Sequence, residues 1–200
     1  MSINTNEYKI ETISKTAANT FLAAHHYLSK AGYSFRSGNN YGLYKGEKLI
    51  GVAVFHGPSV PETAQSCFGL TRTEQQGIWE LGRLAVDDES KVKNLTSWFL
   101  SRCIKQLRKD KDVRAILTYA DTDYHKGFIY QALNFKYYGL SAPKKDFWVE
   151  QADGSFKKQS RGKTSGVKGE WRPRSRKHRY VLVYDKSLKV KWCEEPYPKS

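Results

Sequence analysis

Seven consecutive residues, from Tyr119 to His125, contain two carboxylates, a histidine and two tyrosines. They follow Val113–Ala120, whose apolar composition predicts a buried strand. Ligands of open α/β sheets bind at the carboxyl ends of strands, and side chains of these types can ligate a metal or exchange protons with a substrate. Asp121, still on the strand side, is the stronger candidate. Asp123 or Thr122 could instead cap a helix beginning near Tyr124, and both interpretations stay open.

His25, His26 and Tyr27 lie late in Thr16–Leu28, a segment whose apolar spacing predicts a helix. Neighbouring residues on a helix diverge by about 100°, so only one of the two histidines can face a site unless the helix ends there. Packing into the core is the alternative role for such a histidine.

An arginine, Arg83, stands among apolar residues in the strand predicted at Gly77–Val86. Burying its charge is costly unless the charge is paired. A partner such as Glu80 or Asp121 would explain it structurally, whereas an anionic substrate would explain it functionally.

The most basic segment runs from Lys157 to Arg179 and holds ten lysines or arginines but a single acid, Glu170. Positive charge interrupted by glycines can follow a phosphate backbone, and an embedded tryptophan can stack on a base or wedge into a groove. A solvated basic loop without a ligand is the alternative. The candidate nucleic-acid contacts are Lys157, Lys158, Arg161, Lys163, Lys168, Trp171, Arg172, Arg174, Arg176, Lys177 and Arg179.

The whole composition points to a nucleic-acid partner. The 200 residues carry a net charge of +14, and 39% hydrophobic residues exclude a wholly disordered chain. We expect no membrane partner, because the longest apolar run, Leu49–Phe55, is far shorter than a membrane span. The N-terminus lacks the apolar stretch of a signal peptide, and three scattered cysteines suit a reducing compartment, so we expect a cytoplasmic protein. The sequence leaves open whether it forms a homodimer.

Apolar periodicity and turn residues predict the elements that must position these groups. Strands and helices alternate in the second half, which favours parallel pairing in part of one sheet. We predict an α/β (α+β) fold with a mixed central sheet flanked by helices. Residues 1–143 would form the catalytic core, and 144–200 a basic C-terminal extension with a β-hairpin, packed on the core. The expected elements are Tyr8–Ile13 (strand), Thr16–Leu28 (helix), 41–55 (hairpin), Gly57–Thr73 (loop), Gly77–Val86 (strand), Asn94–Lys109 (helix), Val113–Ala120 (strand), Tyr124–Leu133 (helix), Phe135–Leu140 (strand) and His178–Tyr184 (strand).

This element order resembles the GNAT acyl-CoA acetyltransferase fold. Three motifs are more specifically similar to the bacteriophage Mom family of DNA-modifying proteins, and the closing 196–199 (PYPK) is a weaker fourth. The similarity spans roughly residues 20–199. The three motifs are His26-Tyr27, then Glu80-Leu-Gly-Arg83-Leu with Asn94 and Ser97, and the block from Tyr119 to Phe135 that includes Asp121, Gly127, Tyr130 and Asn134.

The resemblance implies an enzyme that converts adenine in phage DNA to N6-carbamoylmethyladenine, which protects the DNA from host restriction. It implies iron held by His26, Tyr27 and Asp121, a hard-ligand set suited to that metal. It also implies catalytic roles for Arg83, Ser97, Asp121 and Tyr130, and a double-stranded DNA partner whose target adenine is flipped out of the stack. Asn94 and Ser97 are the candidate cofactor contacts.

One departure concerns the donor, which the sequence leaves as acetyl-CoA or another two-carbon compound. The GNAT fold holds the CoA pyrophosphate on a glycine-rich turn at a helix N-terminus. Here that turn has no glycine and carries three consecutive acids, Asp87 to Glu89, which would repel a pyrophosphate. Two other functions stay open: a conventional N-acetyltransferase acting on a protein or small-molecule amine, and a non-catalytic nucleic-acid-binding module. Micromolar binding of acetyl-CoA without DNA would favour the former.

Overall fold

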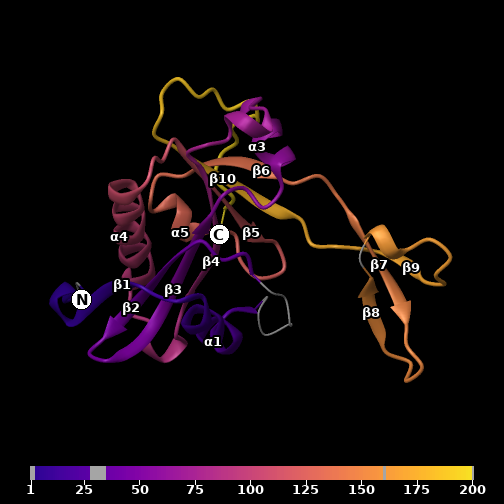
Figure 1. Ribbon diagram of the computed structural model, residues 1–200, viewed down its shortest axis with the longest axis horizontal. Helices are drawn as coiled ribbons and strands as arrows, with labels where there is room; N and C mark the ends of the chain where they lie inside the picture. Colours follow the sequence, from indigo (N-terminus) through magenta and orange to yellow (C-terminus); the bar gives the residue numbers. More distant parts are fainter. Residues whose placement is uncertain (1–2, 28–34, 160, 200) are drawn as a thin grey trace.

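A computed structural model describes residues 3–27, 35–159 and 161–199, arranged as a large and a small sheet with helices on both faces of the large one (Figure 1). The large sheet contains, in spatial order, β1 (Tyr8–Thr12), β2 (Asn39–Lys45), β3 (Lys48–His56), β4 (Ile78–Val86), β5 (Ala115–Asp121), β10 (Lys177–Val183) and β6 (Lys136–Leu140). The small sheet contains β8 (Phe156–Gln159), β7 (Lys145–Glu150) and β9 (Glu170–Pro173). The α-helices are α1 (Lys15–His25), α3 (Pro61–Phe68), α4 (Leu95–Asp110) and α5 (Phe128–Gln131), and short 3₁₀ helices lie at Thr5–Glu7, Arg72–Glu74, Asp88–Ser90 and Arg161–Lys163.

The large sheet is mixed, as the sequence predicts. β4 and β5 are parallel, whereas the other neighbouring strands that the structure describes in this sheet pair antiparallel. The hairpins expected around Gly46 and Gly154 are both present, and each glycine has a positive φ that suits a tight turn. Leu28, the expected end of the first helix, lies outside the described residues.

Helices cover the two faces of the large sheet. On one face, α4 buries Leu95, Phe99, Leu100 and Leu107 completely against the sheet, and each such burial contributes about 2 kcal/mol. On the other face, α1 packs against β3 and α3 packs against β5 and β10. Among the described helices, none has the length and apolar character needed to cross a membrane.

The loop predicted at Gly57–Thr73 is wrong, because it contains α3. Pro61 occupies the first helical position, where its missing N–H costs nothing, and Gly69 ends the helix with a φ of 78°. Ala64 and Cys67 are fully buried against the sheet. Prolines are common in loops, but Pro61 starts a helix here.

The helix predicted at Tyr124–Leu133 is also largely wrong, since only α5, four residues long, forms there. Gly127 precedes it with a φ of 82°, so neither Asp123 nor Thr122 caps a helix. The carboxylate of Asp121 instead accepts the backbone N–H of Asp123 at 3.1 Å. The capping interpretation for this segment is therefore incorrect.

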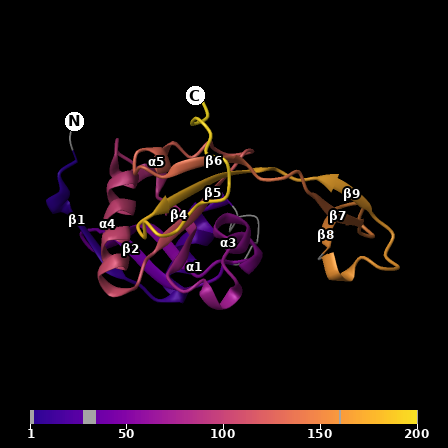
Figure 2. The same ribbon diagram turned by 90° about the horizontal axis from the view of Figure 1, so that it is seen from above.

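The small sheet, residues 145–173 and hereafter the arm, is inserted between two strands of the core. The chain leaves β6, forms the arm, and returns as β10 between β5 and β6. Figure 2 shows the arm projecting away from the core. This differs from the expected C-terminal extension 144–200 packed on the core, because residues 177–183 belong to the large sheet and the last residues contact it, as in the 2.9 Å hydrogen bond from Tyr197 to the Phe135 carbonyl.

Candidate active site

The parallel strands β4 and β5 separate halfway along their length. They pair only from Ile78 to Leu81 and from Ala115 to Thr118. On its other side, β4 pairs Leu81 with Phe55 and Arg83 with Val54, so Gly82 is an extra residue that forms a bulge. A side chain at Gly82 would collide with His56, since a Cβ there would lie 2.1 Å from its Nε2. The bulge therefore opens the sheet immediately before Arg83.

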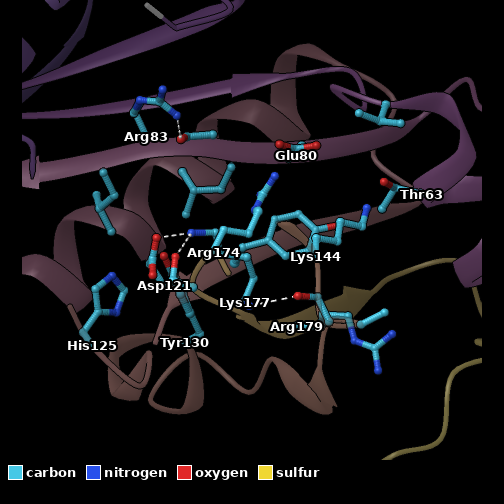
Figure 3. Close-up of a pocket in the computed structure, with 18 of the residues that line it drawn as sticks. Thr63, Glu80, Arg83, Asp121, His125, Tyr130, Lys144, Arg174, Lys177 and Arg179 are labelled. Atoms are coloured by element: carbon cyan, nitrogen blue, oxygen red, sulfur yellow. Dashed lines mark hydrogen bonds and ion pairs between the residues drawn. The ribbon is translucent and has the colours of Figure 1, made fainter. Parts of the chain in front are cut away.

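A cavity of about 540 Å³ lies at this opening (Figure 3). Arg83 and Glu80 come from β4, on one side, and Asp121 and Tyr130 come from β5 and α5, on the other. The cavity is also lined by residues that flank the arm and by part of α3. These further residues include Thr63, Ser66, Ser141, Lys144, Arg174, Ser175 and Lys177.

Arg83 follows the bulge directly and lines the cavity, with its guanidinium folded back on its own strand (Figure 3). Its Nη1 donates to the carbonyl of Gly82 at 2.7 Å. Glu80, proposed above as a structural partner, accepts hydrogen bonds from the backbone N–H and hydroxyl of Ser59 at 3.0 and 2.9 Å. Burial lowers the pKa of Arg83, but the charge of Glu80 nevertheless raises it, so the structural and the functional interpretations of Arg83 both stay predictions.

Asp121 is 4% exposed and forms an ion pair with Lys177, its direct neighbour across the β5–β10 pairing. Burial raises the pKa of the Asp121 carboxyl, but hydrogen bonds from Lys177, Ser175 and the Asp123 amide outweigh it, and the pKa lies below its ordinary value. The site therefore holds an ionised carboxylate. Lys177, expected to contact DNA, lies inside the cavity instead.

His26 and Tyr27 lie at the cavity because α1 ends just before them. His26 has an extended backbone (φ −109°, ψ 126°), which turns its ring away from the direction of His25. The rings of His26 and Tyr27 stack at 4.6 Å, and Tyr27 stacks on Tyr124 at 3.9 Å. Burial lowers the pKa of His26 to about 4, so its imidazole is neutral at pH 7. The helix ends at His25, which is the exception stated for this pair: His26 lines both cavities, and His25 lines the second one as well.

A second cavity of about 610 Å³ shares residues with the first. Both are lined by His26, Tyr27, Leu84, His125 and Tyr130. Burial raises the pKa of the Tyr130 hydroxyl. The two cavities are therefore adjacent, and ligands bound in them would lie next to each other at these shared residues.

Asn94 and Ser97, the candidate cofactor contacts, line only the second cavity. Asn94 has a φ of 68° and precedes α4, and the Ser97 hydroxyl donates to its carbonyl at 3.0 Å. The structure thus separates Ser97 from Arg83 and Asp121, which line the first cavity.

The acidic turn before α4 is partly neutralised within the protein. Asp87 is buried and accepts from Lys48 and Ser90, both at 3.1 Å, while Asp88 pairs with Lys91. The hydrogen bond from Lys48 lowers the pKa of Asp87 and outweighs burial, which raises it. The turn is therefore less repulsive to phosphate than three free carboxylates would be, but it offers no glycine-lined cradle.

Several cations expected to bind nucleic acid have partners within the arm. Asp146 pairs with Lys158 at 2.7 Å and with Arg174 at 3.8 Å, and Arg172 pairs with Glu170. The side chain of Arg161 lies outside the described part of the structure.

Two further arginines hold the core together near the arm. Arg179 lies over the ring of Trp192 at 4.4 Å and donates to the Tyr138 carbonyl. Arg176 donates to the Ser141 carbonyl at 2.6 Å and so joins the two segments that connect the arm to the core. These two arginines therefore contact groups of the protein itself, whereas Lys157, Lys163 and Lys168 are exposed to solvent.

The chemistry of the predicted iron ligands fits a metal in part. The structure brings His26, Tyr27 and Asp121 to one cavity, with His26 neutral and Asp121 ionised, as ligands require, whereas burial raises the pKa of the Tyr27 phenol and so opposes its ionisation. However, Lys177 already pairs with Asp121, and within the described ranges no group of three His, Cys, Asp or Glu side chains lies close enough to hold a metal. Iron stays a prediction.

Sequence reasoning missed several residues of the cavity. Lys144, Ser175 and the α3 residues Thr63 and Ser66 carry no motif, and only the three-dimensional insertion of the arm brings the first two to the site. His125, by contrast, lies in the segment from Tyr119 to His125 that the sequence singles out, and it lines the cavity.

The bulged, separated β4–β5 pair and the cavity beside it define a GNAT-type acetyltransferase fold. The chain superimposes on the polyamine N-acetyltransferase of Drosophila melanogaster with a TM-score of 0.55 and 13% identity, covering 88% of this chain and 100% of that one. It also resembles the ribosomal-protein-S18-alanine N-acetyltransferase of Escherichia coli (TM-score 0.51, 14% identity, 88% and 93% covered). A GNAT family acetyltransferase of Elizabethkingia anophelis, with acetyl-CoA bound, gives a TM-score of 0.51 at 12% identity (90% and 99% covered).

Within that fold class the sequence identifies a particular family. The model of the Mom protein family matches residues 7–199, so this chain belongs to the Mom family. No individual curated protein sequence matches it. Family and fold together support a GNAT-like modification enzyme and confirm the predicted resemblance and fold class.

Proposed function

We propose that this protein modifies adenine in double-stranded DNA, forming N6-carbamoylmethyladenine and so protecting phage DNA from restriction. One observation carries the proposal: the cavity that holds Arg83 and Asp121 is also lined by Lys144, Arg174 and Ser175, from both segments that flank the basic arm. A polymer bound to the arm would therefore lie at the entrance of the cavity. An acceptor as small as a free amine would have no use for that arrangement.

The cavity is suited to a flipped base. Its volume falls within the roughly 300–1,000 Å³ typical of small-ligand sites. Enzymes read a flipped base by hydrogen bonds to its edge and by stacking, and Thr63, Ser66 and Tyr119 offer such groups in the cavity. The second cavity, with Asn94 and Ser97, would hold the donor.

The chemistry proposed for the residues follows from their charges. The N6 nitrogen gains a bond to the methylene carbon of a two-carbon carbamoylmethyl donor, the bond from that carbon to its leaving group breaks, and N6 loses a proton. Whichever of Asp121, which is ionised, and His26, which is neutral, does not hold the metal can accept that proton. Arg83 would stabilise negative charge developing on the donor.

Iron forms part of this proposal. His26, Tyr27 and Asp121 would hold it, and bound iron would supply redox or Lewis-acid activation of the donor carbon. Asp121 must first exchange Lys177 for the metal. Among the structural relatives, a GNAT family acetyltransferase contains acetyl-CoA and a Bacillus subtilis acetyltransferase contains CoA. We keep an acetyl-CoA-type donor as the alternative to another two-carbon compound.

The decisive experiment is to express the protein in a bacterium, digest the DNA to nucleosides and measure deoxyadenosine by mass spectrometry. A product heavier by one carbamoylmethyl group, absent from cells expressing Arg83→Gln, is expected. Unmodified deoxyadenosine with soluble, folded protein and active donor metabolism would contradict the proposal.

A further inference from the structure

The two faces of the arm carry their charges differently. Cross-strand partners in an antiparallel sheet share a face, and successive residues alternate between faces. The register pairs Val149 with Lys157 and Phe147 with both Gln159 and Trp171. We call this the open face; it consists of Lys145, Phe147, Val149, Lys157, Gln159, Trp171 and Pro173. The opposite, paired face consists of Asp146, Trp148, Glu150, Phe156, Lys158, Glu170 and Arg172.

Charges on the paired face neutralise one another. Lys158 lies 2.7 Å from the buried carboxylate of Asp146, and Arg172 pairs with Glu170. The guanidinium of Arg172 also lies over two rings, at 3.9 Å from Phe156 and 5.5 Å from Trp148. A phosphate would have to compete with these internal partners.

The open face has cations but no acid. Lys145 and Lys157 are exposed, and no ion pair joins either of them to a carboxylate in the described part of the chain. Between them Trp171 is 50% exposed and packs on Phe147 at 5.2 Å, which fixes its ring. Lys163 and Lys168, in the following acid-free loop, extend the positive charge beyond the strands.

We propose that the open face of the arm, through Lys145, Lys157 and Trp171, makes the contacts to the duplex DNA beside the target adenine. This inference rests on the proposed function. Unpaired cations on one face match the repeating charge of a phosphate backbone. The backbones of three strands span about 10 Å, which is comparable with the width of the DNA major groove, about 12 Å.

Two adjacent lysines on β8 provide a matched test. Lys157→Gln and Lys158→Gln remove the same charge from neighbouring positions that point to opposite faces. Binding of a duplex oligonucleotide is measured at several salt concentrations for the full chain and both variants. Loss of one phosphate contact should lower the log–log salt slope by about 0.9 and the affinity at 0.15 M salt about fivefold. We expect this for Lys157→Gln, and an unchanged slope for Lys158→Gln.

A second pair of variants tests the aromatic part without altering charge. Trp171→Ala on the open face should weaken binding and leave the salt slope unchanged, whereas Phe156→Ala on the paired face should have little effect on affinity. Melting curves for all four variants control for folding.

Equal slope changes in the two lysine variants, or a larger one in Lys158→Gln, would overturn the inference, as would tighter binding to an RNA duplex of the same sequence. Modified deoxyadenosine is measured for the same proteins. If the wild type modifies DNA but the lysine variants bind alike, only the assignment of the face fails. If no modification occurs but Lys157→Gln alone loses slope, the proposed function fails and the binding face stands.

Discussion

The cavity and the arm both contain many charged side chains, but they use them under different physical conditions. In the cavity, Asp121 is 4% exposed and lies next to Lys177, which is partly buried, so the charge of Asp121 depends on its partner. On the open face of the arm, Lys145 and Lys157 stay in water, where a charge needs no partner and is available to a polyanion. Loss of a charge should therefore alter chemistry or stability in the first region and affinity in the second.

The largest effect is expected from Arg83→Gln. Removing a cation that stabilises charge in the transition state typically costs about 10²–10³ in rate, so DNA modification should fall by at least that factor. Affinity for duplex DNA should stay within about twofold of the wild type, because we propose that the phosphate contacts lie on the arm. Single-turnover modification and equilibrium binding measure the two quantities. A matching loss of affinity would remove the distinction between the regions, and a lowered melting temperature would show a structural role instead.

Lys177→Met tests whether the cavity charges depend on each other. Removing one partner of a buried ion pair leaves the other uncompensated, so the free energy of unfolding in chelator should fall by about 3 kcal/mol. The same change frees Asp121 for a metal, and elemental analysis of protein purified without chelator should find more iron per chain than in the wild type. Lys157→Met is the control and should change neither. Unaltered iron content in Lys177→Met would contradict an iron site that includes Asp121.

Acid should destabilise the cavity through His26. Its folded pKa, lowered by burial to about 4, lies below the unfolded value near 6.5, so the unfolded chain binds the extra proton between these pH values. This residue alone should therefore lower the free energy of unfolding by about 1.4 kcal/mol for each pH unit between 6.5 and 4. Denaturant unfolding of His26→Asn should show a shallower pH dependence than that of the wild type. An identical slope in the two proteins would show that His26 is not buried in its neutral form.

Arg179→Ala should have the smallest effect. This arginine belongs to the basic segment in sequence but lies over Trp192 in the core, so its loss should reduce stability by about 1 kcal/mol. DNA affinity and its salt slope should not change. A lower salt slope for Arg179→Ala would show that Arg179 contacts DNA.

Much of the core could be predicted from the sequence because its signals are local. Apolar periodicity located α4, β5 and both hairpins, and Asp121 was found because it ends a buried strand. α3 was missed because a proline at the first helical position looks the same in sequence as one in a loop. Whether such a proline starts a helix depends on which neighbouring residues are buried. A local sequence pattern does not contain that information.

The sequence could not predict which cations of the basic segment are paired within the protein and which are exposed, because this depends on pairing between distant residues. Asp146 pairs with Lys158, and Asp121 pairs with Lys177, over 12 and 56 positions of the chain. In sequence, Lys157 and Lys158 are indistinguishable. Only the register of the small sheet places them on opposite faces.

The insertion of the arm has a consequence for how such enzymes can diversify. Its two ends are tied together at the core, where the Ser141 N–H donates to the Lys177 carbonyl at 2.8 Å and the Ser141 hydroxyl accepts the Lys177 N–H at 2.9 Å. Because these contacts close the loop at its base, a tight turn or a different subdomain could replace residues 145–173 without changing the strands that hold Arg83 and Asp121. The DNA recognition proposed for the arm would then depend on one continuous segment, and exchanging that segment could redirect the same core to another acceptor.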